Sequence, residues 1–150
     1  MITLLRRLAL TLTLIAGTST NAQAQDALTI ERVKDGLYTI FGSGGNVGVR
    51  ITSEGVILVD DKYPRNFQEI QRLVGTVTSQ PVKYVINTHH HGDHSGGNIE
   101  YINIAEVIAH QNARDNMLRN DQDAPPRLVF SDETAAVSYT HLTLPTSDLV

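Results

Sequence analysis

The chain has 150 residues, enough for one small domain, and a formal net charge of −4. It contains no cysteine, which excludes disulfides and zinc sites built on thiolates. A chain without cysteine is compatible with any redox compartment, so this absence assigns no location. The acidic balance argues against nucleic acid as the main partner.

The first 24 residues have the features of a secretory signal peptide. A short basic start with Arg6 and Arg7 precedes the apolar run 8–17, and an Ala-x-Ala pattern ends at Ala24. A membrane anchor is the alternative, but the run is well short of the ~20 residues that a span requires. We predict cleavage after Ala24, a formal charge of −6 for the mature protein and a periplasmic or secreted location, with no membrane contact after cleavage.

The next part of the chain alternates between strand and turn patterns. Apolar and alternating runs predict strands over residues 28–33, 37–41, 46–51 and 56–59. We interpret the Gly-rich segment 42–46 as a hairpin connection. A phosphate-binding loop is the alternative, but no Lys-Ser/Thr pair follows and no helix opens there.

A core helix is predicted over residues 64–78. Its apolar side chains recur at helical spacing on one face, which favours packing over a binding role. Asn66 followed by Glu69 resembles a capping arrangement at its start.

The run THHHGDHSGGN, residues 88–98, is the most informative part of the chain. It contains four potential metal ligands, which are His89, His91, Asp93 and His94, and it directly follows an apolar strand predicted over 82–87. Imidazole nitrogens and carboxylate oxygens are the usual ligands of a catalytic zinc ion. Because α/β folds place their chemistry at the ends of buried strands, we predict a metal site here.

The spacing divides these ligands into two pairs. In an extended segment residues i and i+2 point to the same side, so His89 and His91 can bind one ion while the residue between them points away. Gly92 lets the backbone turn, so that Asp93 and His94 face a neighbouring point, suitable for a second ion roughly 3.5–4 Å from the first. Two such ions lower the pKa of a shared water from about 15.7 towards 7. A His-rich loop that binds metal adventitiously is the alternative.

The same run resembles the His-x-His-x-Asp-His signature of the metallo-β-lactamase superfamily, in the form found in glyoxalase II-like thioesterases and subclass-three β-lactamases. The resemblance covers about residues 27–134. It implies an α/β fold, the αββα metallo-β-lactamase sandwich, of which this chain holds the N-terminal half only. It also implies a hydrolytic site, usually with two zinc ions per full-length chain. His89 and His91 would hold the first ion, and Asp93 and His94 the second, with Asp93 also acting as a catalytic residue on the nucleophilic water.

Two acids, Asp60 and Asp61, follow the apolar strand predicted over 56–59. An acid at the end of a buried strand is costly unless it is paired or solvated. In the resembling family an aspartate here orients the metal-binding loop without binding the ion, and Asp60 matches that position best. Many relatives carry a small polar residue where this chain has Asp61, which we interpret as a turn acid at the surface. A pair of surface turn acids is the alternative.

Beyond the ligand run, we predict a short helical segment through Ile99, a strand over 105–109, a helix through Leu118 and a strand that begins at Leu128. His110 follows the first of these strands and could be a third ligand of the first ion. In the resembling family a histidine here commonly caps or packs, and the third ligand comes much later. We therefore interpret His110 as structural.

The end of the chain does not resemble the family. Residues 136–150 include Ser-Tyr-Thr-His-Leu-Thr-Leu, which looks like translated sequencing-adapter sequence. The predicted organisation is thus a signal peptide at 1–24, the N-terminal part of a metallo-β-lactamase domain at 25–135 and a non-native tail at 136–150. A genuine strand-like tail is the alternative, since the segment alternates. Relatives carry their remaining metal ligands in a second half that cannot be placed in this chain.

Together these patterns predict a secreted zinc-dependent hydrolase whose metal-bound hydroxide attacks a small ester, lactone, thioester or β-lactam. Export favours β-lactams and small esters or lactones over a cytosolic thioester. The literal 150-residue chain is expected to be inactive and poorly soluble and to bind metal weakly, because half a sandwich leaves an apolar sheet face uncovered. The alternatives are a non-catalytic zinc-binding protein and an inactive truncated gene product.

Overall fold

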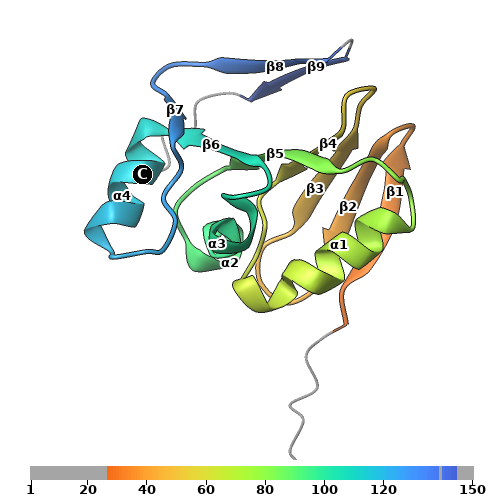
Figure 1. Ribbon diagram of the computed structural model, residues 1–150, viewed down its shortest axis with the longest axis horizontal. Coiled ribbons are helices and arrows are strands. Elements are labelled where there is room, and N and C mark those ends of the chain that lie inside the picture. Colours follow the sequence, from red (N-terminus) through yellow and green to blue (C-terminus); the bar gives the residue numbers. More distant parts are fainter. Residues whose placement is uncertain (1–26, 139, 145–150) are drawn as a thin grey trace, which may run out of the picture.

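A computed structural model describes residues 27–138 and 140–144 (Figure 1). The predicted signal peptide at residues 1–24 and its cleavage site lie outside the described residues. Within the described ranges, no helix has both the length and the apolar character needed to cross a membrane.

One mixed seven-stranded sheet forms the body of the molecule, with its strands in chain order across the sheet (Figure 1). The first four strands pair antiparallel as a meander, and the fourth to the seventh pair parallel. The strands are β1 (Thr29–Lys34), β2 (Leu37–Phe41), β3 (Val47–Ile51), β4 (Val56–Val59), β5 (Val82–Asn87), β6 (Glu106–His110) and β7 (Leu128–Phe130).

Helices fill the crossovers that parallel pairing requires. The 3-10 turn η1 (Pro64–Asn66) and α1 (Phe67–Gly75) connect β4 to β5, whereas α4 (Gln111–Arg119) connects β6 to β7. Between β5 and β6 lie two short helices, α2 (Gly92–Ser95) and α3 (Asn98–Tyr101). Because each crossover adds a strand in the same direction and such crossovers are right-handed, these helices share one face of the sheet (Figure 1).

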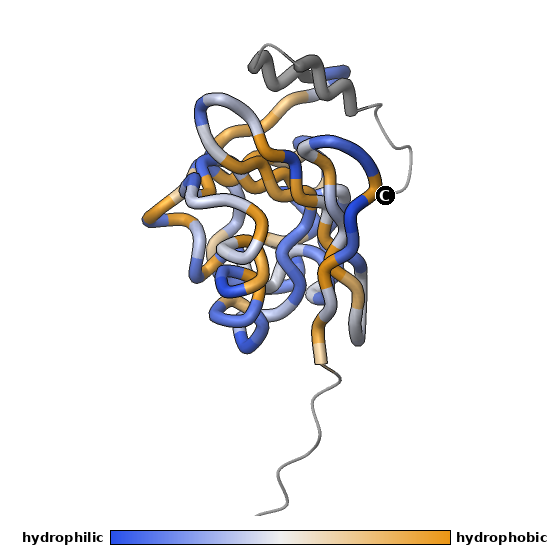
Figure 2. Tube along the Cα trace, turned by 90° about the vertical axis from the view of Figure 1, so that its right-hand side faces the viewer, coloured by the Kyte–Doolittle hydropathy of each residue, from blue (hydrophilic) through white to orange (hydrophobic). Residues whose placement is uncertain are grey.

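The core lies between this face of the sheet and the helices. Val49 pairs with Leu58 and Leu58 with Val85, so that one row of fully buried side chains crosses three strands. Each such side chain contributes roughly 1.5–3 kcal/mol by leaving water. Helix α1 covers the row with Ile70, Leu73 and Val74. In Figure 2 several hydrophobic stretches run through the middle of the body, and one lies at its left-hand edge.

The observed elements follow the predicted ones closely, with two corrections at α1. The expected capping arrangement is wrong, because the Asn66 side chain makes no cap hydrogen bond. Glu69 instead accepts two hydrogen bonds from Arg72, at 2.7 and 2.8 Å. The helix also ends at Gly75 rather than at residue 78.

The last described segment forms a sheet of its own. β8 (Thr134–Ser138) and β9 (Thr140–Leu144) pair antiparallel, separate from the main sheet (Figure 1). This pairing agrees with the strand-like alternation of the segment. The non-native origin of residues 136–150 stays a prediction, and residues 145–150 lie outside the described part.

Candidate metal centre

The candidate site lies where the parallel strands β4 and β5 end, at one edge of the sheet. Val59 pairs with Ile86, and the next amide along, that of Asp60, donates to the Ile86 carbonyl at 2.9 Å. Strand pairing therefore extends one residue past β4. It brings Asp60 beside Thr88, the first residue of the ligand run.

The Asp60 carboxylate is buried and organises the start of this run. Its Oδ1 accepts from the Thr88 amide at 2.7 Å, and its Oδ2 accepts from the Thr88 hydroxyl at 2.8 Å. Oδ2 also lies 2.7 Å from Nδ1 of His94. Asp60 reaches these partners with a φ of 65°, a left-handed conformation that costs a non-glycine residue roughly 1–2 kcal/mol.

This contact decides which nitrogen of His94 is available. A carboxylate only accepts hydrogen bonds, so Nδ1 carries the proton in the neutral ring and Nε2 keeps a free lone pair. Histidines that bind metal commonly donate their second ring N–H to a carboxylate in this way. Nε2 lies 3.5 Å from Oδ2 of Asp93, so the two predicted ligands of the second ion are adjacent.

His89 and His91 form the other predicted pair. Nε2 of His89 lies 3.1 Å from Nδ1 of His91. Two nitrogens bound to one tetrahedral zinc ion at about 2.0–2.1 Å lie about 3.3 Å apart, so this spacing suits a shared ion. The His89 ring also lies 4.1 Å from that of His94, between centroids. Burial lowers the pKa of His89, which favours the neutral ring that metals bind.

The donor set therefore fits zinc in kind, although neither pair completes a coordination shell. Within residues 27–138 and 140–144, no three His, Asp or Glu side chains are grouped to hold one ion. Each pair offers two ligands, one fewer than a catalytic zinc ion normally has. The assignment of His89, His91, Asp93 and His94 as metal ligands stays a prediction.

The turn inside the ligand run differs in one detail from the expectation. Gly92 begins α2 without a positive φ, and a side chain there would meet open space. The turn therefore needs no glycine. Ser95 stabilises it instead, because its hydroxyl donates to the carbonyls of His90 and His91, each at 3.2 Å.

The interpretation of Asp61 as a surface acid is wrong, since its side chain is completely buried. Oδ1 accepts from the Gly97 amide at 3.0 Å, while Oδ2 has no partner among the described residues. Burial raises the pKa of this carboxyl well above its usual range, Gly97 opposes the change and Asp60 adds to it. The cause is the tight approach of the turn after α2, which brings Gly97 against the carboxylate.

The Gly-rich connection lies directly over the ligands. A Cβ on Gly45 would sit 2.4 Å from Cε1 of His94, and one on Gly44 would sit 2.9 Å from Cβ of Asp93. The hairpin interpretation is confirmed, since the connection joins the antiparallel strands β2 and β3. Its contact with the ligands was not predicted, and the available signal was the pair Gly44-Gly45, which has no side chains.

His110 is confirmed as structural. It is the N-cap of α4, where Nδ1 accepts from the Asn112 amide at 3.1 Å. Its Nε2 lies 2.8 Å from the Ser131 carbonyl. Both ring nitrogens are therefore engaged at this strand-to-helix junction, which leaves none for a metal ion.

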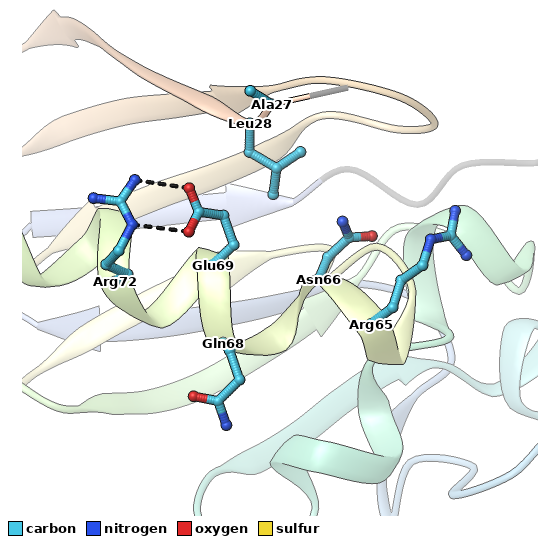
Figure 3. A pocket seen from close by; sticks show the side chains of 7 residues that line it. All are labelled: Ala27, Leu28, Arg65, Asn66, Gln68, Glu69 and Arg72. Atoms are coloured by element: carbon cyan, nitrogen blue, oxygen red, sulfur yellow. Dashed lines mark hydrogen bonds and ion pairs between the residues drawn. The ribbon is translucent and has the colours of Figure 1, made fainter. Parts of the chain in front are cut away.

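A hollow of about 550 Å³ lies elsewhere, between the start of β1 and α1 (Figure 3). We call it the groove, and it is lined by Ala27, Leu28, Arg65, Asn66, Gln68, Glu69 and Arg72. None of these residues belongs to the ligand run. The groove is therefore separate from the candidate metal centre.

Comparison with known proteins identifies the family of this chain. The model of the family described as metallo-beta-lactamase superfamily matches residues 42–128, more than half of the chain, including the whole ligand run. Among curated proteins, none matches the chain.

Solved structures share the fold at low identity. A metallo-beta-lactamase from Pontibacter korlensis is 21% identical with a TM-score of 0.67, over 77% of this chain and 59% of its own. The FIM-1 enzyme from Pseudomonas aeruginosa, in its mono-zinc form, is 17% identical with a TM-score of 0.65, over 77% and 57%. DIM-1 metallo-beta-lactamase is 19% identical with a TM-score of 0.63, over 73% of this chain and 54% of its own. The predicted fold, the N-terminal part of an α/β metallo-β-lactamase sandwich, is confirmed, and the chain spans little more than half the length of these proteins.

Proposed function

This chain belongs to the metallo-β-lactamase superfamily, and we propose that the protein containing it is a zinc-dependent hydrolase of small esters, lactones, thioesters or β-lactams. The observation that carries the proposal is the 2.7 Å contact between Asp60 and Nδ1 of His94. In the neutral ring this contact leaves the lone pair of Nε2 beside Asp93 and close to the His89 ring. A buried acid thereby prepares a nitrogen for metal binding.

The residues of the chain have distinct roles in this proposal. His89 would bind through Nε2 and His91 through Nδ1, the two nitrogens that face each other. His94 and Asp93 would hold a second ion. When bound, zinc would supply an acidified water and a polarised substrate oxygen. Asp93, with an accessible carboxylate at the centre, would accept or orient the proton of that water.

Asp60 and the Gly-rich loop act through these ligands. Asp60 keeps the proton of His94 on Nδ1 and fixes the direction of the ring. Gly44 and Gly45 close one side of the centre, so near to Asp93 and His94 that a Cβ on either glycine would overlap the ligand. Water and substrate must therefore approach from elsewhere.

A zinc-binding protein without catalysis is the second candidate. It is favoured by the arrangement of the described ligands in two pairs, with no group of three. An inactive truncated gene product would bind no zinc in fixed proportion and turn over nothing.

The test uses the full-length protein that carries this chain. Zinc-loaded and chelated samples are compared on a chromogenic β-lactam, a lactone, an ester and a thioester, together with Asp93→Asn. Asp123→Asn, at an exposed acid in the loop after α4, is the matched control. A hydrolase loses turnover with the chelator and with Asp93→Asn but keeps it with Asp123→Asn. Bound zinc without turnover on any substrate favours the binding protein.

We also propose that the protein is exported and acts on a small molecule outside the cytoplasm. The support is the basic start with Arg6 and Arg7 and the Ala-x-Ala pattern that ends at Ala24. Export favours a β-lactam, ester or lactone as substrate. Sequencing the N-terminus of the protein from the periplasm or medium tests this, because cleavage leaves Gln25 as the first residue. An intact Met1 there would contradict it.

A further inference from the structure

Lys62 is completely buried two residues after Asp60, and neither the sequence nor the proposed chemistry assigns it a role. Its φ of 59° is left-handed, as is that of Asp60. A buried ammonium group is unfavourable unless hydrogen bonds replace its water. The strained backbone and the buried charge together indicate that the surroundings require this side chain in this place.

The ammonium group is held by the Gly-rich loop. Nζ donates to the carbonyl oxygens of Ser43, at 3.1 Å, and of Gly45, and lies 3.5 Å from that of Gly42. Lysine has three donors and no acceptor, which matches a set of three carbonyl oxygens. The negative ends of these carbonyl dipoles converge on one point, and the ammonium charge stabilises them there.

The backbone of Lys62 fixes the other side of the centre. Its carbonyl accepts from the amide of Gly97 at 2.9 Å. Gly97 lies just after α2, which carries Asp93 and His94. Lys62 therefore joins the loop above the ligands to the segment that follows them.

The charge of Lys62 also faces the centre. Burial lowers the pKa of its ammonium group, and the carboxylate of Asp93 opposes that change. The carbonyl contacts of Nζ lie in the same loop whose Gly44 approaches Asp93. A movement of this loop would therefore change the space around that ligand.

The contacts of the loop show why its position matters. Gly45 approaches the ring of His94 so closely that a Cβ would overlap it, and Gly44 approaches Asp93 in the same way. A Cβ on Gly44 would also lie 3.1 Å from the ring of Tyr63, so the loop is packed closely on this side. The position of the loop backbone therefore sets the space that the ligands can occupy.

We propose that Lys62 is a positioning residue of the metal centre, whose ammonium holds the loop of residues 42–45 against His94 and Asp93 and thereby fixes the direction of both ligands. Lys62 itself binds neither metal nor substrate. This inference rests on the proposed metal-dependent function. It differs from a purely structural role, in which loss of the ammonium would lower stability and leave metal binding by the folded protein unchanged.

The experiment compares Lys62→Met and Lys62→Arg with wild type in the full-length protein, with cobalt(II) as the probe. Three quantities are measured on folded protein: the cobalt affinity, the visible cobalt spectrum and amide hydrogen exchange in residues 42–46. Lys83→Met, at an exposed lysine of β5, is the matched control. If Lys62→Met does not fold, Lys62→Gln, which keeps an amide donor for one carbonyl, takes its place.

We expect Lys62→Met to bind cobalt about 10-fold more weakly or worse, as for other residues that orient metal ligands. Its spectrum changes and its loop amides exchange faster, whereas Lys62→Arg recovers part of both effects and Lys83→Met matches wild type. Wild-type cobalt affinity in folded Lys62→Met, or weaker binding without faster loop exchange, would overturn the inference. A wild-type protein that binds no cobalt would contradict the proposed function, and the inference would fall with it.

Discussion

The groove beside α1 and the candidate metal centre both contain charged side chains, but they differ in what these side chains leave available. In the groove, Glu69 and Arg72 satisfy each other with two hydrogen bonds (Figure 3). In the centre, Asp60 satisfies one nitrogen of His94 and leaves the other free. In the groove these two charges are therefore already paired, whereas the centre has ring nitrogens that face one another. The comparison teaches that the capacity to bind a metal ion follows from lone pairs that are held in place without a hydrogen-bond partner. It does not follow from the presence of a hollow.

The two regions also arise from different parts of the fold. The groove is formed by the first turns of one amphipathic helix and the start of an edge strand. The centre is formed where two parallel strands in the middle of the sheet end side by side. Such strand ends bring residues far apart in sequence to one point, which is why α/β folds place ligand sites there.

The largest expected effect is that of Asp60→Asn. The change removes the charge that holds Nδ1–H of His94 and the Thr88 hydroxyl. We expect zinc affinity to fall by about 10–100-fold, measured by competition with a chromophoric chelator. Asp61→Asn is the neighbouring control, because it keeps an oxygen for the Gly97 amide, and its affinity should match wild type. Equal losses in both variants would mean that Asp60 acts only through folding.

A methyl group on the Gly-rich loop should have the next largest effect. Gly45→Ala places a Cβ 2.4–2.7 Å from ring atoms of His94, so either the loop or the ring must move. Such overpacking costs about 1–3 kcal/mol of stability, and zinc affinity should fall with it. Gly75→Ala, where a Cβ meets nothing within 4 Å, is the control. Urea unfolding and zinc titration of both variants check this, and a neutral Gly45→Ala would show that the loop does not press on the ligand.

A smaller, pH-dependent effect is expected at Asp61. Because burial raises its pKa in the folded protein, the folded state keeps a proton that the unfolded state has released once the pH exceeds the usual value of about 4. Its contribution to the free energy of unfolding is therefore complete at low pH and falls as the pH rises towards the raised pKa. Asp61→Asn lacks this loss, so it should gain stability relative to wild type between pH ~4.5 and ~7.5. Urea unfolding at both pH values measures the difference, and a constant difference would disprove the raised pKa.

The smallest effect is expected in the groove. Arg72→Ala removes an ion pair whose two side chains are 59% and 39% exposed, and such surface pairs contribute little to stability. Zinc affinity and turnover should equal those of wild type. A clear loss of either would give the groove a function and break the contrast between the two regions.

The sequence predicted the parts of the centre that are local. Residues 82–87 form a strand with the predicted bounds, because a continuous apolar run there is bounded by Pro81 and the polar ligand run. His110 was interpreted correctly because a strand-to-helix junction is where a cap is needed. In both cases the signal lies within a few neighbouring residues.

The parts that the sequence missed depend on contacts between distant segments. Lys62 donates a hydrogen bond to the carbonyl of Ser43, 19 residues away in sequence, and Asp61 accepts one from the amide of Gly97, 36 residues away. No periodicity marks such pairs, and a buried acid or lysine looks the same in sequence as an exposed one. The Gly-rich loop was correctly predicted to be a hairpin connection. Its approach to His94 could not be predicted, because it depends on how β2 and β3 are placed against α2.

The most direct test of the account is the zinc content of the purified full-length protein after exhaustive dialysis, measured for wild type and for the double variant His89→Asn/His91→Asn. The account predicts that wild type retains zinc in fixed proportion and that the double variant loses at least the ion held by this pair, while the far-ultraviolet circular dichroism spectra agree. Equal zinc content in the two proteins, or none in wild type, would contradict the claim that these histidines form a metal centre.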